Sequence, residues 1–331
     1  MTMASAEPLT SDRETIDRAG ALSAFKRSDV AFYWATKLAA LLVLALLGGI
    51  ILSLIVGAWP AITAFGPGFL TTQRWAPQLE EPVMGGLGPL YGTLVSSFIA
   101  MLIAVPVGLG ISIFLTEFCP PSLRRPIALA IELLAGIPSI IYGMWGFFVL
   151  GPFLAETVQP FMIATFGRLP LIGALFAGPP SQLSLFNASL ILAIMVLPFI
   201  TAISRDVFAT VPAVLKEAAY GVGCTTWEVV RRVVLPYTRV GVIGGVMLAL
   251  GRALGETMAV TFIIGNSFKI TGSLFSPGTT ISAAIASEFA ESAGLHQSAL
   301  MLLGLFLFVL TFAVLSAARL MLIRLELKQG R

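Results

Sequence analysis

Six stretches of mostly apolar residues divide the chain, and no other feature constrains its fold as strongly. They lie at residues 32–56, 90–115, 127–150, 189–207, 240–265 and 298–321. A helix of about 20 apolar residues matches the hydrocarbon thickness of a bilayer and satisfies its own backbone hydrogen bonds there. The sequence therefore predicts an all-α bundle with six membrane spans.

The composition supports a membrane protein. Only 11% of the 331 residues are charged and 57% are hydrophobic, whereas about a quarter of a soluble domain is charged. The net charge of +3 comes from basic residues that flank the apolar stretches, so it does not indicate a nucleic-acid-binding face. The single His296 excludes a multi-histidine metal site, and no metal is expected. Cys119 and Cys224 are too few for a disulfide framework and are expected to be reduced thiols.

The distribution of Lys and Arg predicts the orientation, because cytoplasmic loops are enriched in them. Sixteen of the 20 fall on one side of the predicted spans: Arg13, Arg18, Lys26, Arg27, Lys37, Arg124, Arg125, Arg205, Lys216, Arg231, Arg232, Arg239, Arg319, Arg324, Lys328 and Arg331. We therefore expect cytoplasmic segments at residues 1–29 and 325–331. Between them, residues 30–324 form the membrane domain, and both termini are cytoplasmic.

The segment at residues 161–176 leaves the topology partly open. It is apolar enough to lie at the membrane interface or to form a re-entrant or seventh span. A seventh span would reverse the orientation of everything after it, and the basic residues at 205–239 argue against that.

Residues 211–237 form the most informative loop on the basic side, VPAVLKEAAYGVGCTTWEVVRRVVLPY. The pattern predicts a helix over 211–221, which glycines at 221 and 223 terminate. Thr225 or Thr226 is then expected to cap a second short helix over 227–234. Pro236 is expected to stop that helix before the fifth span.

The spacing of this loop resembles the EAA loop of permease subunits in ATP-binding-cassette importers. The matching residues are Glu217, Ala218, Ala219, Gly223, Val233, Leu235 and Pro236. The resemblance implies the type I importer permease fold, also called MetI-like, with a loop that docks onto ATP-hydrolysing subunits. The alternative is an ordinary basic loop between two spans.

The fifth span carries two charges, Arg252 and Glu256, in the sequence GRALGETMAVTFIIGN. Arg252 follows Arg239 by about 20 Å of helix, near the bilayer centre, where a lone charge costs about 2.5–3.5 kcal/mol. A spacing of four residues places the two charges on one helix face. The pair is either a structural ion pair or a substrate site. In the second case the planar guanidinium group of Arg252 binds an oxyanion, and Glu256 holds that guanidinium group in place.

Three motifs make residues 30–324 resemble the permease C subunit of phosphate-specific importers: YGTL at 91–94, IPSIIYGMWG at 137–146 and GRALGETMAV at 251–260. The resemblance implies phosphate passage at Arg252 and Glu256 in a bacterial inner membrane. It implies as partners a second homologous permease, two ATP-binding subunits and a periplasmic phosphate-binding protein. Ser139, Tyr142 and Asn266 are weaker pathway candidates, because hydroxyls near a kink more often repair the backbone.

Other functional classes fit less well. An ion-coupled secondary transporter would need an inverted repeat or a broken helix at the midplane, and no repeat is evident. The chain has no phosphate-binding Gly-Lys-Ser/Thr loop and no His-Glu-x-x-His pattern, so it is not expected to be an enzyme or to bind a cofactor. ATP is expected to be bound and hydrolysed by partner subunits. The sequence therefore favours a channel-forming permease, and the resemblance implies phosphate as its cargo, with another oxyanion or small solute as the alternative.

Overall fold

The computed structural model of this protein describes residues 10–170 and 173–328, with side chains from residue 29 to residue 324 in those ranges. The chain divides into two units, residues 1–56 and residues 57–331. Helix α1, Thr10–Phe65, supplies the described part of the first unit and passes residue 29 without a break. From Phe32 to Val56 nearly all its large apolar side chains are exposed, as a lipid-facing span requires.

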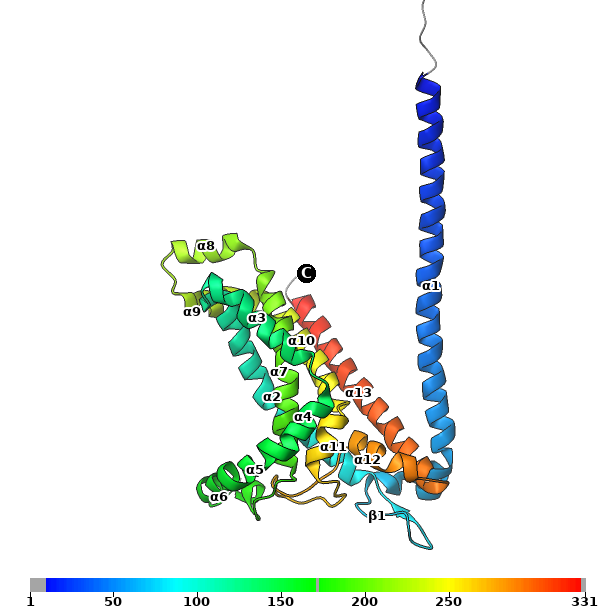
Figure 1. Ribbon diagram of the computed structural model, residues 1–331, viewed down its shortest axis with the longest axis vertical. Coiled ribbons are helices and arrows are strands. Elements are labelled where there is room, and N and C mark those ends of the chain that lie inside the picture. Colours follow the sequence, from blue (N-terminus) through cyan, green and yellow to red (C-terminus); the bar gives the residue numbers. More distant parts are fainter. Residues whose placement is uncertain (1–9, 171–172, 329–331) are drawn as a thin grey trace, which may run out of the picture. The chain divides into compact units, whose positions relative to one another are not determined.

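The second unit is almost entirely helical (Figure 1). Its α-helices are α2 (Leu87–Ile113), α3 (Pro121–Ala135), α4 (Ser139–Trp145), α5 (Gly151–Phe153), α6 (Gln159–Phe166), α7 (Leu185–Ala209), α8 (Ala213–Gly221), α9 (Thr226–Val229), α10 (Leu235–Leu254), α11 (Met258–Ile264), α12 (Ile281–Glu288) and α13 (Leu295–Lys328). Four π-helical segments extend or join them: η2 (Phe114–Phe118), η3 (Gly146–Leu150), η4 (Leu154–Val158) and η6 (Val230–Val234). Three 3-10 turns are η1 (Gly66–Leu70), η5 (Gly173–Phe176) and η7 (Phe289–Glu291).

Six helical stretches of the described chain are long and apolar enough to cross a membrane, which confirms the predicted number. They run over Asp29–Leu70, Leu87–Phe118, Ser139–Phe166, Leu185–Ala209, Thr226–Leu254 and Leu295–Arg324. The first, second, fourth and sixth contain the predicted spans. The third and fifth differ from the prediction because the chain interrupts both of those apolar stretches.

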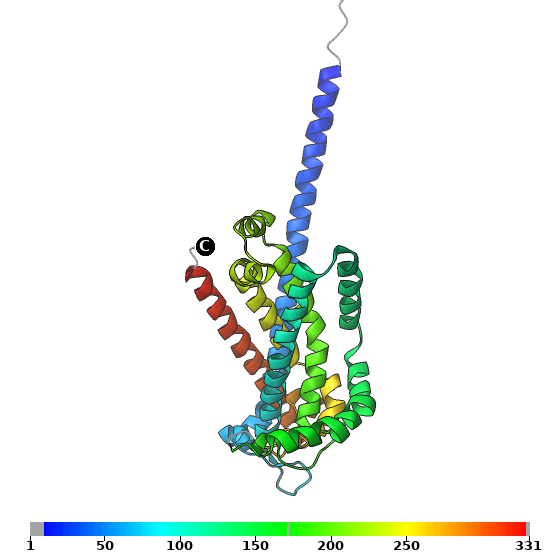
Figure 2. The ribbon, with the colours of Figure 1, turned by 90° about the vertical axis from the view of Figure 1, so that its left-hand side faces the viewer.

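The third apolar stretch was predicted as one helix over 127–150, and this is wrong. Helix α3 ends at Ala135 and α4 begins at Ser139. Pro138 has no N–H and disfavours a helical conformation at the residue before it, so the helix cannot continue through this point. In Figure 2, α3 lies above α4 at the right of the view. The uninterrupted helix continues from Ser139 to Phe166, so the first part of the segment at 161–176 belongs to it.

Helix α7 is the most buried of the six apolar helices and lies along α2. The α2 face that packs inward repeats a small residue every fourth position. These residues are Gly88, Gly92, Ser96, Ala100, Ala104, Gly108 and Ser112, and all are buried. A Cβ added at Gly108 would come within 2.9 Å of Ile200 Cγ2 on α7. The stripe therefore lets the two backbones approach closely.

The two ends of the second unit differ (Figure 1). Helices α8 and α9 lie at one end, which we call the α8 end. A two-stranded antiparallel hairpin, β1 (Trp75–Ala76) and β2 (Val83–Met84), lies at the other, which we call the hairpin end. The hairpin pairs Trp75 with Met84. The sequence did not predict these strands.

Candidate functional site

The fifth membrane helix is broken where its two charges lie. Helix α10 ends at Leu254, and α11 begins at Met258. Gly255 is a weak helix former, and the Glu256 carboxylate accepts a hydrogen bond from the Ala259 backbone N–H at 3.4 Å. A side chain that bonds nearby backbone groups competes with the helix at this point. The prediction of one continuous helix over 240–265 is therefore wrong.

The break separates Arg252 from Glu256. Arg252 lies in the last turn of α10 and is exposed, whereas Glu256 is half-buried beside the start of α11. No ion pair joins them in the part of the chain that the structure describes. Each charge instead suits its helix end, because a cation is favoured at a helix C-terminus and an anion at an N-terminus. The predicted shared helix face does not exist.

The break in the fifth helix lies beside α4, which starts at the break in the third apolar stretch. A Cβ on Gly143 of α4 would come within 3.1 Å of the Met258 carbonyl and of Ala259, at the start of α11. Tyr142 is buried in the same apolar cluster as Ala253 and Ala259. The two interruptions are therefore neighbours, and interrupted helices at membrane depth are characteristic of substrate and ion sites.

The weaker candidates divide between two places. Ser139 is half-buried at the start of α4. The Tyr142 hydroxyl donates to the Leu134 carbonyl at 2.7 Å and so ties α4 to the end of α3 across their interruption. Asn266 lies beyond the other end of α11, where its amide donates to Ser287 Oγ at 2.9 Å. The structure thus brings Ser139 and Tyr142 to the break but not Asn266.

The loop at the α8 end has the predicted two-helix form. Helix α8 carries Glu217, Ala218 and Ala219, and Gly223 turns the chain with a φ of +88°. A positive φ is a conformation that glycine adopts at little cost. Thr225 caps α9 in a capping box with Glu228, which satisfies free backbone donors at both residues.

The prediction for Pro236 is wrong. The helix continues from Thr226 through the π segment η6 and into α10 without ending. Pro236 occupies the first turn of α10, directly after η6, and Leu235 packs into the apolar cluster around Phe208. A π segment already shifts the hydrogen-bonding register, so a residue without an N–H fits there.

Several large apolar side chains of this loop are exposed. Helix α8 has no buried side chain, and Val214, Val222 and Trp227 are 71%, 82% and 57% exposed. Several large apolar side chains exposed together on a polar end of a molecule indicate a surface that contacts another protein. This observation fits the docking role implied for Glu217, Ala218, Ala219, Gly223, Leu235 and Pro236.

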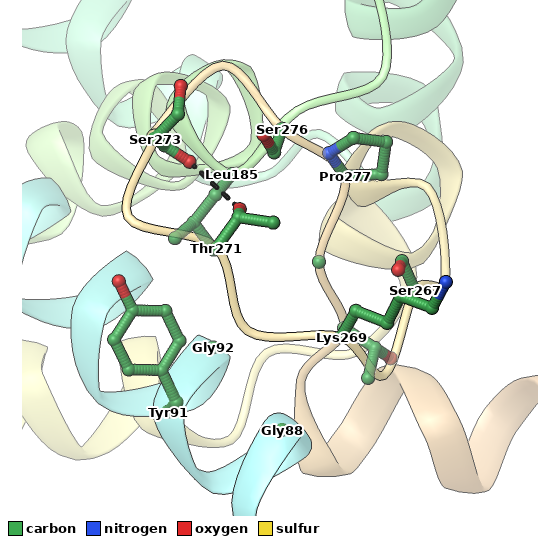
Figure 3. Close-up of a pocket in the computed structure, with 12 residues that line it drawn as sticks. Gly88, Tyr91, Gly92, Leu185, Ser267, Lys269, Thr271, Ser273, Ser276 and Pro277 are labelled. Atoms are coloured by element: carbon green, nitrogen blue, oxygen red, sulfur yellow. Dashed lines mark hydrogen bonds between the residues drawn. The ribbon is translucent and has the colours of Figure 1, made fainter. Parts of the chain in front are cut away.

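The hairpin end holds two pockets that the sequence did not reveal. Figure 3 shows the smaller one, where the loop at 267–279 arches over Gly88, Tyr91 and Gly92 at the start of α2. Hydroxyl groups and Lys269 line it. The larger pocket, of about 590 Å³, is lined by Trp75, Phe268 and three ionisable side chains, Glu288, Glu291 and His296.

Within this larger pocket, Glu288 organises the contacts. Its Oε2 atom accepts a hydrogen bond from Trp75 Nε1 at 2.8 Å and lies 2.9 Å from His296 Nε2. Trp75 also stacks on Phe268, with the ring centres 4.7 Å apart. These contacts fix the hairpin against the loop and α13, so the pocket has a defined shape.

Comparison with known proteins agrees with this architecture. The profile of the family described as "Binding-protein-dependent transport system inner membrane component" matches residues 108–325. The phosphate transport system permease protein PstC of Mesorhizobium japonicum is 61% identical over 307 residues, which cover 92% of this chain and 93% of that protein.

Two solved structures share the fold. One is a bacterial ABC transporter involved in the import of the polysaccharide alginate, with a TM-score of 0.57 and 17% identity over 86% of this chain and 95% of that one. The other is the MetNI methionine ABC transporter, with a TM-score of 0.53 and 17% identity over 72% of this chain and 94% of that one. The fold is therefore that of type I importer permeases. The chain belongs to the family of binding-protein-dependent transport system inner membrane components, as a multi-pass protein of the inner membrane.

Proposed function

We propose that this chain is a channel-forming permease subunit of an ATP-driven importer and that it passes inorganic phosphate into the cytoplasm. The observation that carries the proposal is Arg252, an exposed guanidinium at a break in a membrane helix, without an ion pair in the described structure. A planar, permanently charged guanidinium group recognises phosphate oxygens well. The PstC name of its 61% identical relative supports the same cargo.

Glu256 limits how tightly the anion binds. Its carboxylate is fixed beside the start of α11 by the Ala259 N–H, four residues from Arg252. A negative charge held near the site lowers the local positive potential, so an anion that enters is also able to leave. We propose Ser139 and Tyr142 as neighbouring parts of the pathway, and Asn266 only as part of its entrance at the hairpin end.

The family name requires a substrate-binding protein, and an ABC importer requires ATP-binding subunits. The chain has no phosphate-binding loop of its own, so the permease binds no nucleotide and ATP is bound and hydrolysed by its partners. We propose that two ATP-binding subunits and a second, homologous permease complete the complex. The exposed surface of α8 and α9 is the docking surface for an ATP-binding subunit.

We propose that the α8 end faces the cytoplasm, with both termini, and that the hairpin end faces the periplasm. The excess of Lys and Arg on one side of the spans supports this orientation. The Trp75, Phe268 and Glu288 pocket then faces the periplasmic phosphate-binding protein.

A broken membrane helix is also a feature of ion-coupled transporters, so the break favours that class as a second candidate. The docking loop distinguishes the two classes, because an ion-coupled transporter has no partner to cover Val214, Val222 and Trp227. Another oxyanion remains the alternative cargo.

Co-purification followed by reconstitution tests the proposal. We expect the tagged chain to retain ATP-binding subunits and a second permease. In proteoliposomes, the phosphate-loaded binding protein is expected to stimulate ATP hydrolysis. Stimulation by a sodium or proton gradient in place of ATP would contradict the proposal.

A further inference from the structure

Lys216 of α8 forms an ion pair with Glu117 in η2, the π segment that ends the second membrane helix. The Nζ and Oε1 atoms are 2.5 Å apart, and the two side chains are 21% and 6% exposed. Desolvation makes a nearly buried carboxylate unfavourable unless a cation compensates it. The charge of Glu117 therefore fixes the position of Lys216.

Apart from its short chain connections to α7 and to the helix Thr226–Leu254, little else attaches α8 to the membrane helices. The helix has nine residues and no buried side chain, and an isolated helix of this length is unstable in water. Ala219 packs partly against the cluster around Phe208 and Val229. It follows Lys216 by three residues, so both lie on the same helix face. Among the described residues, the pair with Glu117 is the only ion pair between α8 and a membrane helix.

The helix that carries Glu117 reaches the opposite end of the second unit. It is continuous over Leu87–Phe118, 32 residues, or about 48 Å at the rise of an α-helix. At its hairpin end it fits closely under the loop at 267–279 (Figure 3). A Cβ on Gly92 would come within 1.9 Å of the Thr279 carbonyl oxygen. The Ile281 N–H also donates to Thr93 Oγ1 at 2.9 Å.

We infer that the Glu117–Lys216 ion pair transfers a displacement of α8 to the second membrane helix and, through it, to the loop at 267–279. The inference rests on the proposed function, in which ATP-binding subunits move α8. A charged pair that is mostly shielded from water interacts more strongly than an exposed one, and it resists both separation and sliding. The contact of Ala219 alone would resist neither separation nor sliding. Glu117 and Lys216 are positioning residues, since neither touches cargo or nucleotide.

The test uses the complete reconstituted complex, with two single variants, Glu117→Gln and Lys216→Met, and the exchange of both residues. Phosphate uptake and ATP hydrolysis are measured in the same proteoliposomes. We expect both single variants to keep their ATP-binding subunits and their basal ATP hydrolysis. Phosphate taken up per ATP should fall about tenfold or more, within the range typical of coupling between two sites. The exchange, Glu117→Lys with Lys216→Glu, should restore most of it.

Glu132→Gln is the control for the loss of another ion pair. It removes the 2.7 Å ion pair between Glu132 of α3 and Arg205 of α7, at the same end of the bundle but away from α8. We expect uptake per ATP to remain near that of the unmodified complex. An equal loss in this control would overturn the inference, since any lost ion pair would then have the same effect.

Unchanged phosphate uptake per ATP in both single variants would also overturn the inference. Loss of the ATP-binding subunits from the variants would overturn it too, because the ion pair would then serve only to shape the docking surface. The unmodified complex tests the proposed function separately. If it transports no phosphate, stimulation of ATP hydrolysis by the binding protein replaces uptake as the measure of coupling in each variant.

Discussion

Arg252 and Glu256 lie on opposite sides of a break in the fifth membrane helix, one in the last turn of α10 and the other just before α11. The same two residues on a continuous helix would form a surface pair four residues apart. The break instead gives each charge a helix end of opposite partial charge. This arrangement determines what the exchange of the two residues should do.

The variant Arg252→Glu with Glu256→Arg should not transport phosphate. Each exchanged charge meets the unfavourable end of its helix, at a cost of about 0.3–1 kcal/mol per charge, and the guanidinium leaves the last turn of α10. We expect normal membrane insertion, a modest loss of thermal stability and loss of uptake. Arg252→Lys is the control that keeps the cation in place. Near-normal uptake by the exchange variant would show that the cargo site lies elsewhere.

Two replacements of Gly223 should separate the effect of an added negative charge on uptake from the effect of backbone strain. Gly223 has a φ of +88° and no atom within 4 Å of an added Cβ. Asn and Asp tolerate positive φ better than other residues with a Cβ, at a cost of about 1–2 kcal/mol. Gly223→Asn should therefore support uptake, whereas Gly223→Asp places a negative charge where an ATP-binding subunit approaches and should abolish it. Equal uptake by the two variants would remove the support for docking at this turn.

Gly92→Ala should disturb the hairpin end, because the new Cβ meets the Thr279 carbonyl oxygen at 1.9 Å and backbone cannot move aside easily. We expect a destabilisation of about 1–3 kcal/mol, the usual range for overpacking. Gly110→Ala is the matched control on the same helix, since its Cβ meets nothing within 4 Å. It should be neutral or stabilise by about 0.5–1 kcal/mol. Thermal unfolding in detergent measures both, and an undisturbed Gly92→Ala protein would argue against the close fit.

The proposed orientation predicts which introduced cysteines an impermeant reagent reaches. Cys119 and Cys224 are free thiols, so both are replaced by serine to give the background for labelling. A cysteine at position 78 in the hairpin should react in intact spheroplasts, and one at position 228 in α9 should react only after the membrane is opened. Labelling of position 228 from outside would reverse the assigned topology.

The sequence predicted the number of spans and the two-helix loop because both depend on local signals. Six apolar stretches require six long helices, and Thr225 with Glu228 forms a capping box over four residues. The breaks at Gly136–Pro138 and Gly255–Thr257 were missed because each is short and apolar residues flank it on both sides, so the whole stretch is still apolar enough to read as one span. The rule that proline stops a helix failed for Pro236. The π segment directly before it shifts the hydrogen-bonding register, so the helix tolerates a residue without an N–H.

Contacts between distant segments could not be predicted from one sequence. Lys216 and Glu117 are 99 residues apart, and neither residue alone indicates its partner. The small residues of α2, in contrast, repeat every fourth position from Gly88 to Ser112. That pattern was present in the sequence, and it would have predicted the close packing of α2 before the structure was known.

Uptake of labelled phosphate by proteoliposomes that contain the complete complex tests the central claim most directly, with the unmodified chain compared with Arg252→Gln. A neutral amide has the size to fill the site but no charge to attract an oxyanion. We predict ATP-dependent phosphate uptake that exceeds sulfate uptake in the unmodified complex. With Arg252→Gln, uptake should be lost while the protein remains assembled in the membrane. Normal phosphate uptake by an assembled Arg252→Gln complex would contradict the account.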